Sequence, residues 1–250
     1  MNPRFSFGAI ALVAALASGV LTGAAPAFAD TRSSGTFDLD IRGFRAGVLQ
    51  FSGTTSASGY AVTGKLESTG IAAMIRKIRF DAAASGRLSS GRWSPARYDE
   101  QADTGKRQSQ SRMEYHGGIP TEMIKDSREG RPNYVDPATQ GGTVDPLTAL
   151  YATLRDVPAD QACNLKLVMF DGARRSQITL SAAETAGETA SETITCAGEY
   201  RRLAGFSDKE MAEKQRFPFR LTYGPAEGDM VRVVSVSMDS LYGRASLTRR

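Results

Sequence analysis

Few residues in this sequence combine the types and the spacing that catalysis or ligand binding requires. The nearest match to a chemical motif is the run Gly59-Tyr-Ala-Val-Thr-Gly64-Lys65, which has the glycine and lysine spacing of a phosphate-binding loop. Such a loop needs Ser or Thr directly after the lysine to hold magnesium, and this chain has Leu66 there. Because the run also alternates apolar and polar residues like a strand, we expect no nucleotide site here.

His116 is the only histidine of the chain, which excludes a metal site built from several histidines. A catalytic triad would have to use it in a segment that ends at Gly117-Gly118, and no G-x-S-x-G turn is present to hold a nucleophilic serine. We therefore expect an exposed histidine in a turn.

Two pairs of carboxylates are close enough in sequence to suggest an acid–base dyad or a calcium site: Asp38 with Asp40, and Glu100 with Asp103. Asp38 and Asp40 would share one face of a strand, because side chains in a strand alternate between the two faces. The spacing of an EF-hand loop is absent. We interpret both pairs as solvated charge, and we predict no catalytic, cofactor-binding or metal-binding residues, no cofactor and no enzymatic activity. A hydrolase that uses carboxylates or an unrecognised serine is the alternative.

Residues 1–29 have the pattern of a secretory signal peptide. Arg4 supplies a positive charge, residues 7–21 are mostly apolar, and small residues lead to Ala27-Phe28-Ala29. We predict cleavage after Ala29 and a periplasmic location for residues 30–250. An uncleaved anchor would need about 20 apolar residues, and polar and glycine residues interrupt this run from position 18 onward. No second apolar stretch follows, so we predict no integral membrane span after cleavage.

Cys163 and Cys196 are the only cysteines. In an oxidising compartment an even count favours a disulfide. Both positions fall in segments that we predict to be strands, and the bridge would stabilise the fold by about 3 to 4 kcal/mol. A redox pair is the alternative, but it lacks the C-x-x-C spacing.

The formal net charge of +4 is small for a chain of 250 residues. A small excess spread over a whole domain does not create the focused field that nucleic acid requires, so we predict no nucleic-acid binding. The pairs Arg174-Arg175, Arg201-Arg202 and Arg249-Arg250 are too scattered to form a polybasic patch for lipids.

The elements that must position these residues are mostly strands, because the apolar residues occur in short alternating runs between glycine- and proline-rich turns. We predict a mainly β fold in one domain, residues 30–250, with a curved antiparallel sheet that forms a β-roll or open barrel. Pro95 requires an edge or a bulge in its strand, and the nearby Trp93 and Tyr98 either pack the core or line a cavity. The expected strands cover residues 36–42, 46–55, 60–68, 78–87, 93–101, 106–115, 163–170, 174–181, 193–201, 218–223, 230–238 and 241–250.

One or two short helices are expected beside these strands. Asp145 and Pro146 have the types of an N-cap and a first helical residue, so we predict a helix of about three turns after them. A second apolar stripe, formed by Ile71, Met74, Ile75 and Ile78, predicts a short helix or bend packed against the core. Residues 126–146, which precede the first of these predicted helices, are rich in Gly and Pro and predict irregular surface structure. We also expect a mobile loop at 182–192 and a brief polar helix near 207–216.

Several short motifs together resemble a bacterial family called domain of unknown function 3108. They are G-x-L-x-F at Gly47 to Phe51, G-Y-x-V at Gly59 to Val62, W-S-P-x-x-Y at Trp93 to Tyr98, and V-D-P-L-T-A-L at Val144 to Leu150. The Asp171-Gly172 turn and the run R-F-P-F-R-L-T-Y that ends at Tyr223 agree with it. The resemblance implies a curved antiparallel β fold in an envelope protein, and it implies no catalytic residues.

Two hypotheses for the function follow. The first is a non-enzymatic module that binds an apolar or amphipathic envelope molecule, such as a lipid, in a concave face of the sheet. The second is a structural or assembly factor that docks on another envelope protein through a sheet edge or the loop at residues 126–146.

Overall fold

The computed structural model describes residues 30–125, 133–183 and 193–250, and its main feature is one antiparallel sheet of 14 strands. The predicted β-rich class is therefore confirmed. The strands of the first half are β1 (Thr31–Ile41), β2 (Phe44–Thr55), β3 (Tyr60–Ser68), β4 (Arg79–Ser89), β5 (Arg92–Asp103), β6 (Gln108–His116) and β7 (Ile119–Lys125). Those of the second half are β8 (Val157–Pro158), β9 (Leu165–Phe170), β10 (Arg175–Ala182), β11 (Ile194–Ala204), β12 (Arg216–Pro225), β13 (Met230–Ser240) and β14 (Gly243–Arg249).

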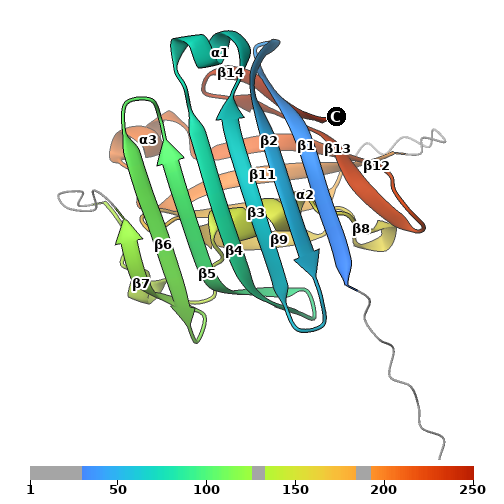
Figure 1. The fold of residues 1–250 in the computed structure, drawn as a ribbon, viewed down its shortest axis with the longest axis horizontal. Coiled ribbons are helices and arrows are strands. Elements are labelled where there is room, and N and C mark those ends of the chain that lie inside the picture. Colours follow the sequence, from blue (N-terminus) through green and yellow to red (C-terminus); the bar gives the residue numbers. More distant parts are fainter. Residues whose placement is uncertain (1–29, 126–132, 184–192) are drawn as a thin grey trace, which may run out of the picture.

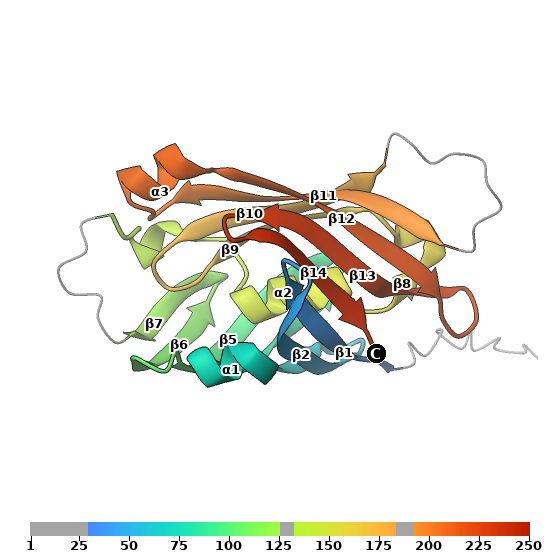
Figure 2. The same ribbon diagram turned by 90° about the horizontal axis from the view of Figure 1, so that it is seen from above.

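The sheet order is β7-β6-β5-β4-β3-β2-β1-β14-β13-β12-β11-β10-β9, with the short β8 paired to β13. Each half is thus a meander of consecutive strands, and the two halves join where β1 pairs with β14, from Phe37 opposite Arg249 to Ile41 opposite Ala245. The two halves lie over one another as two layers, and the strands of one cross those of the other (Figure 1, Figure 2). The sheet stays open, because its ends β7 and β9 do not pair with each other.

The helix α2 (Pro146–Leu154) occupies the space between the two layers (Figure 2). Two glycines of the first half allow its close approach, because a Cβ added at Gly53 or at Gly64 would lie 2.6 Å from Tyr151 or Leu147 of the helix. The Tyr151 ring meets Phe51 edge-on, with the ring centroids 5.9 Å apart. The core of the protein is therefore a helix enclosed by a folded sheet, and aromatic and aliphatic side chains fill the interior together.

The predicted start of α2 is confirmed. Asp145 is the N-cap and Pro146 the first residue, and the Asp145 side chain accepts a hydrogen bond from the Thr148 backbone N–H. The hairpin around residues 56–59 and the turn at Asp171-Gly172 also form as predicted, as does the polar helix, α3 (Asp208–Glu213). A register shift lies next to Gly86, which faces Pro95 across β4 and β5, so the expected bulge is present.

The apolar stripe at residues 71–78 does not pack the core as predicted. A short helix, α1 (Gly70–Ile75), does form, but Met74 is 87% exposed and Ile75 is 82% exposed. The helix closes the link between β3 and β4 at one end of the sheet (Figure 1), where no layer of the fold covers it. Helical spacing of apolar residues predicts a helix with an apolar face. It does not predict whether another part of the chain packs against that face.

The end of the loop predicted at 126–146 is buried at residues 143–145, contrary to the prediction of surface structure, while residues 126–132 lie outside the described ranges. Thr143 and Val144 lie in the interior, because Val144 runs beside β9. Its backbone N–H donates to the Val168 carbonyl at 2.9 Å, and its carbonyl accepts from the Phe170 N–H at 2.9 Å. These bonds satisfy the backbone of the buried loop and lead the chain into α2.

Two further segments differ from the prediction, and two others lie outside the described residues. The strand β7 was not expected from the sequence. Cys163 precedes β9 rather than lying in a strand, and its φ of 58° places it in the left-handed region. The signal peptide at 1–29 and most of the loop at 182–192 lie outside the described residues.

Candidate functional site

A cleft of about 570 Å³ lies between the two halves of the sheet, next to the turn between β4 and β5. The first half contributes the turn and the two strands that flank it, α2 contributes its C-terminal end, and the second half contributes β9, β10 and β12. Its apolar walls are formed by Leu88, Trp93, Ala152, Val157, Leu165, Leu167, Leu180 and Tyr223. Its polar lining includes Arg155, Gln161, Asn164 and Lys166.

Arg155, the C-cap residue of α2, brings a positive charge into this cleft. Its guanidinium carbon lies 5.6 Å from the centroid of the Trp93 ring, within the range of a cation–π contact. One terminal nitrogen, Nη1, donates to the Asp156 backbone carbonyl at 3.4 Å, while the buried Nε has no hydrogen-bond partner among the described residues. Burial lowers the pKa of Arg155, because desolvation disfavours the charged form.

The nearest carboxylate to Arg155 in sequence, Asp156, is engaged elsewhere. Its Oδ2 accepts from Nη2 of Arg232 at 2.8 Å, and its Oδ1 lies 3.8 Å from Nη2 of Arg249. Arg155 forms no ion pair within the part of the chain that the structure describes. The end of α2 therefore carries more positive than negative charge, and Arg155 is the group left to meet an anion from the cleft side.

The Trp93 ring, which forms the aromatic wall of the cleft, packs against two core tyrosines on its buried side. Its ring meets Tyr60 at 4.8 Å and Tyr151 at 5.8 Å between centroids, both edge-on. Trp93 is buried within the core while also lining the cleft, so both of its predicted roles are realised. Tyr98 packs only in the core, where its hydroxyl donates to Glu100 Oε2 at 2.6 Å.

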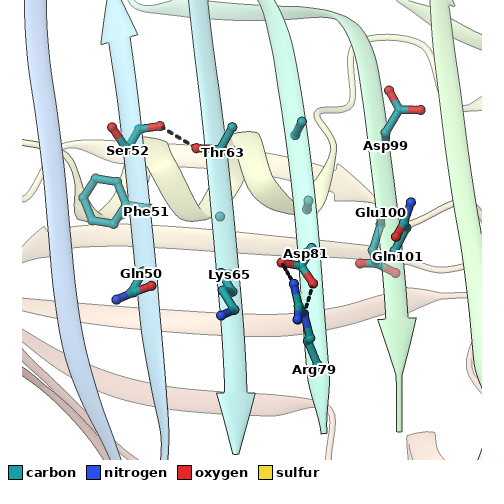
Figure 3. Close-up of a pocket in the computed structure, with 13 residues that line it drawn as sticks. Gln50, Phe51, Ser52, Thr63, Lys65, Arg79, Asp81, Asp99, Glu100 and Gln101 are labelled. Carbon is teal, nitrogen blue, oxygen red and sulfur yellow. Dashed lines mark hydrogen bonds and ion pairs between the residues drawn. The ribbon is translucent and has the colours of Figure 1, made fainter.

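A larger groove of about 660 Å³ lies on the outer face of β2 to β5 (Figure 3). Its charged side chains already neutralise one another. Arg79 pairs with Asp81, Lys65 pairs with Glu67 at 2.8 Å, and Asp99 accepts from two arginines. The paired arginine is the main cause that lowers the pKa of Asp81. We regard this groove as the solvated face of the sheet.

A buried polar chain ties α2 to β3. The Tyr60 hydroxyl lies 2.8 Å from Thr148 Oγ1, and Thr148 Oγ1 donates to Asp145 Oδ2 at 2.6 Å. Because Thr148 uses its one proton toward the carboxylate, the Tyr60 hydroxyl donates to Thr148. Asp145 is fully buried, and desolvation raises its pKa to about 6. The chain is closed off from the cleft, and its role is to hold the helix on the sheet.

The residues that the sequence singled out do not converge on one site. After Gly59, the run up to Lys65 forms the first part of the extended strand β3. It does not form a loop that could surround a phosphate. His116 ends β6, where its exposed ring lies 2.6 Å from the Thr121 hydroxyl.

The two predicted carboxylate pairs are also engaged with neighbours. Asp38 and Asp40 both pair with Arg45. Glu100 accepts from Tyr98, and Asp103 accepts from the Gly105 N–H in a turn. Among the described residues, no group of three or more His, Cys, Asp or Glu side chains is arranged to hold a metal.

The two cysteines are the exception, because Cys163 and Cys196 form the predicted disulfide with their Cα atoms 5.2 Å apart. Arg155 was not predicted as a site residue from the sequence, because a single arginine after a helix does not form a recognisable motif. Its neighbours Trp93 and Tyr223 come from distant parts of the chain, and only the fold brings them together.

These features define a class of protein: an open antiparallel β structure folded around a helix, with a half-enclosed cleft between its two layers. The chain belongs to the family described as "Protein of unknown function (DUF3108)", which matches residues 36–203. A crystal structure described as a beta-barrel-like protein of domain of unknown function DUF1849 from Brucella abortus is similar, with 13% sequence identity and a TM-score of 0.48. That similarity covers 88% of this chain and 95% of the other. No curated protein matches. None of the helices in the described ranges is long and apolar enough to span a membrane.

Proposed function

We propose that this protein is a non-enzymatic binding module that holds an anionic amphipathic molecule in the cleft between the two layers. The observation that carries the proposal is Arg155, whose Nε is buried without a hydrogen-bond partner beside a wall of aromatic and aliphatic side chains. A largely buried cation without a counter-ion is costly, and an anionic group in the cleft would compensate the charge of the guanidinium.

The shape and lining of the cleft agree with a ligand that has one charged end. Its volume of about 570 Å³ falls in the range of small-molecule sites. Trp93, Leu165 and Tyr223 offer an apolar surface, while Lys166 lies exposed at the same cleft. A carboxylate, sulfonate or phosphate bound to Arg155 would leave the apolar part of the molecule against these walls.

The test uses a fluorescent probe, dansyl-aminoundecanoic acid, and its uncharged methyl ester. We expect the wild-type protein to bind the acid more tightly than the ester. The substitution Arg155→Gln should weaken binding of the acid about tenfold or more, because a charge-assisted hydrogen bond contributes roughly 1.5 to 3 kcal/mol. Binding of the ester should stay unchanged.

The matched control is Arg201→Gln, which removes an exposed arginine of β11 outside the cleft. It should leave the affinity for both probes at the wild-type value. Equal binding of the acid by wild-type protein and Arg155→Gln, with both proteins folded by circular dichroism, would contradict the proposal.

We also propose that the protein works outside the cytoplasm, in the periplasm. The disulfide between Cys163 and Cys196 supports an oxidising compartment, and residues 1–29 have the pattern of a cleaved signal. Protein purified from the envelope fraction should begin at Asp30 by mass spectrometry. An intact N-terminus in that fraction would contradict the predicted cleavage.

The alternative function, docking of an envelope protein on a sheet edge, has less support. The edge strand β9 already accepts Val144 as a neighbour, so part of this edge is occupied within the chain. Crosslinking in intact cells separates the two functions, because a single dominant protein adduct at β7 or β9 would favour docking.

A further inference from the structure

Most of the exposed large apolar side chains lie at one end of the sheet. Of the six in the described residues, five belong to three neighbouring segments. We call these segments the rim: α1, the turn between β1 and β2 with the first residue of β2, and the turn between β13 and β14. The five side chains are Phe44, Met74, Ile75, Leu241 and Tyr242.

The three segments of the rim are in direct contact. The Arg42 N–H donates to the Arg244 carbonyl at 2.8 Å, and Arg42 Nε donates to the Tyr242 carbonyl at 2.6 Å, which joins the two turns. The Thr69 N–H donates to the Ala46 carbonyl at 3.1 Å, which joins α1 to β2. Figure 1 shows α1 and both turns at the same end of the molecule, and Figure 2 looks down on this end.

Four of the five side chains are strongly exposed, and the fifth, Leu241, is 37% exposed. Phe44 is 71% exposed and Tyr242 is 73% exposed, comparable to Met74 and Ile75. The five side chains are distributed over the three segments of the rim: Phe44 begins β2, Met74 and Ile75 belong to α1, and Leu241 and Tyr242 belong to the turn between β13 and β14.

Basic residues surround the apolar side chains. Arg76 and Lys77 follow α1 directly and are exposed. The turn between β5 and β6 adds Lys106, and it touches the same place, because a Cβ added at Gly105 would lie 2.8 Å from the Lys77 carbonyl. Arg42, Arg45 and Arg244 complete the set.

The acidic groups near the rim do not cancel this charge. Asp38 pairs with Arg45 and Arg250, Asp40 pairs with Arg45, and Asp239 lies 3.6 Å from Arg244. Asp103, at the turn between β5 and β6, accepts from the Gly105 N–H and from Gln108 Nε2. Arg76 and Lys77 have no ion pair among those of the described residues. The rim therefore combines exposed apolar side chains with a local excess of positive charge, although the chain as a whole is close to neutral.

We propose that the rim docks on a bilayer surface that contains anionic lipids. Exposed apolar side chains beside lysines and arginines suit the interface of a membrane, where apolar groups enter between lipid chains and cations meet the headgroups. Arg76 and Lys77 are exposed directly after Met74 and Ile75, so the charge of the rim complements anionic headgroups.

This surface is distinct from the cleft. The strand β4 begins next to α1 and ends at the turn that borders the cleft, so the two features lie at opposite ends of the same strand. A protein docked by its rim would keep the mouth of the cleft away from the lipid headgroups.

The test is co-sedimentation with vesicles of phosphatidylcholine alone, and with vesicles of equal parts phosphatidylcholine and phosphatidylglycerol. We expect binding to the anionic vesicles that weakens with salt, and little binding to the neutral ones. Arg76→Glu combined with Lys77→Glu should reduce binding at least twentyfold, since each cation near an anionic surface contributes roughly fivefold. Met74→Ser combined with Ile75→Ser should reduce it about tenfold or more.

Matched controls come from the other parts of the molecule. Ile119→Ser removes the sixth exposed apolar residue, which lies outside the rim, and Arg87→Glu combined with Arg92→Glu reverses two exposed charges at the far end of β4. Both should bind anionic vesicles like the wild type. Binding that the rim variants do not change overturns the proposal. So does concentration-dependent self-association that the Met74/Ile75 variant abolishes, without vesicle binding, since it would assign the rim to a second copy of the chain.

Discussion

Asp145 combines two properties that rarely occur together, because it caps a helix and is also fully buried. Its carboxylate accepts two hydrogen bonds from Thr148, which favour the charged form, but the loss of water around it outweighs them. The result is a pKa raised to about 6. The Asp145 carboxyl group at the start of α2 therefore becomes protonated in mildly acidic solution.

This raised pKa predicts a pH dependence of the free energy of unfolding. Between about pH 4 and pH 6 the folded state binds a proton at Asp145 that the unfolded state has released. The contribution of Asp145 is thus most favourable below about pH 4 and is lost as the pH rises through about 6, with an amplitude on the order of 3 kcal/mol. Denaturant unfolding across this range measures it.

The variant Asp145→Asn separates this contribution from those of other acids. Asparagine still caps a helix, and it does not titrate, so its stability relative to the wild type should rise with pH across the window. The same substitution at Asp136, the exposed cap of the short 3-10 helix at Pro137–Thr139, controls for the loss of a negative charge. If both variants differ from the wild type in the same pH-dependent way, burial of Asp145 is not the cause.

At the scale of elements, the disulfide ties the strand β11 to the segment before β9, across the intervening strand β10. Cys163 and Cys196 are 33 residues apart, so the bond closes a loop of substantial length in the unfolded chain. We expect its removal in Cys163→Ala combined with Cys196→Ala to lower the free energy of unfolding by about 3 to 4 kcal/mol.

Reductant provides the control for this experiment. A thiol reductant should lower the denaturation midpoint of the wild type toward that of the double variant, and it should leave the double variant unchanged. A wild-type midpoint that equals that of the double variant under oxidising conditions would show that the bond does not contribute.

Local signals in the sequence predicted the elements that are determined by local interactions. The Asp145-Pro146 start of α2 and the turn at Asp171-Gly172 depend on the conformations of a few adjacent residues, and both were found. Burial of Val144 and exposure of Met74 depend on which distant strand lies next to them, and both were predicted wrongly. The same limit applies to the cleft, whose walls come from both halves of the chain.

At the scale of the whole molecule, β1 and β14 are the strands that join the two halves of the sheet among the described residues. Removal of residues 243–250 would leave β1 without a neighbour on one side, and it would leave β13 with only the two-residue strand β8 there. We expect the shortened protein to lose the single cooperative unfolding transition of the full chain, as measured by denaturant titration.

Removal of Arg250 alone is the matched control. This residue pairs with Asp38 at the surface, and such a pair contributes about 1 kcal/mol or less, so the transition should remain cooperative. A cooperative transition near the wild-type midpoint without residues 243–250 would mean that α2 alone holds the two layers together.

The same join between β1 and β14 sets an order of events during folding. The strands β1 to β7 can pair with their neighbours in sequence, but β1 gains its second neighbour only when β14, which begins at Gly243, is in place. Until then one long edge of the sheet formed by β1 to β7 is unprotected. We infer that the folding chain depends on a chaperone for the interval in which this edge is open.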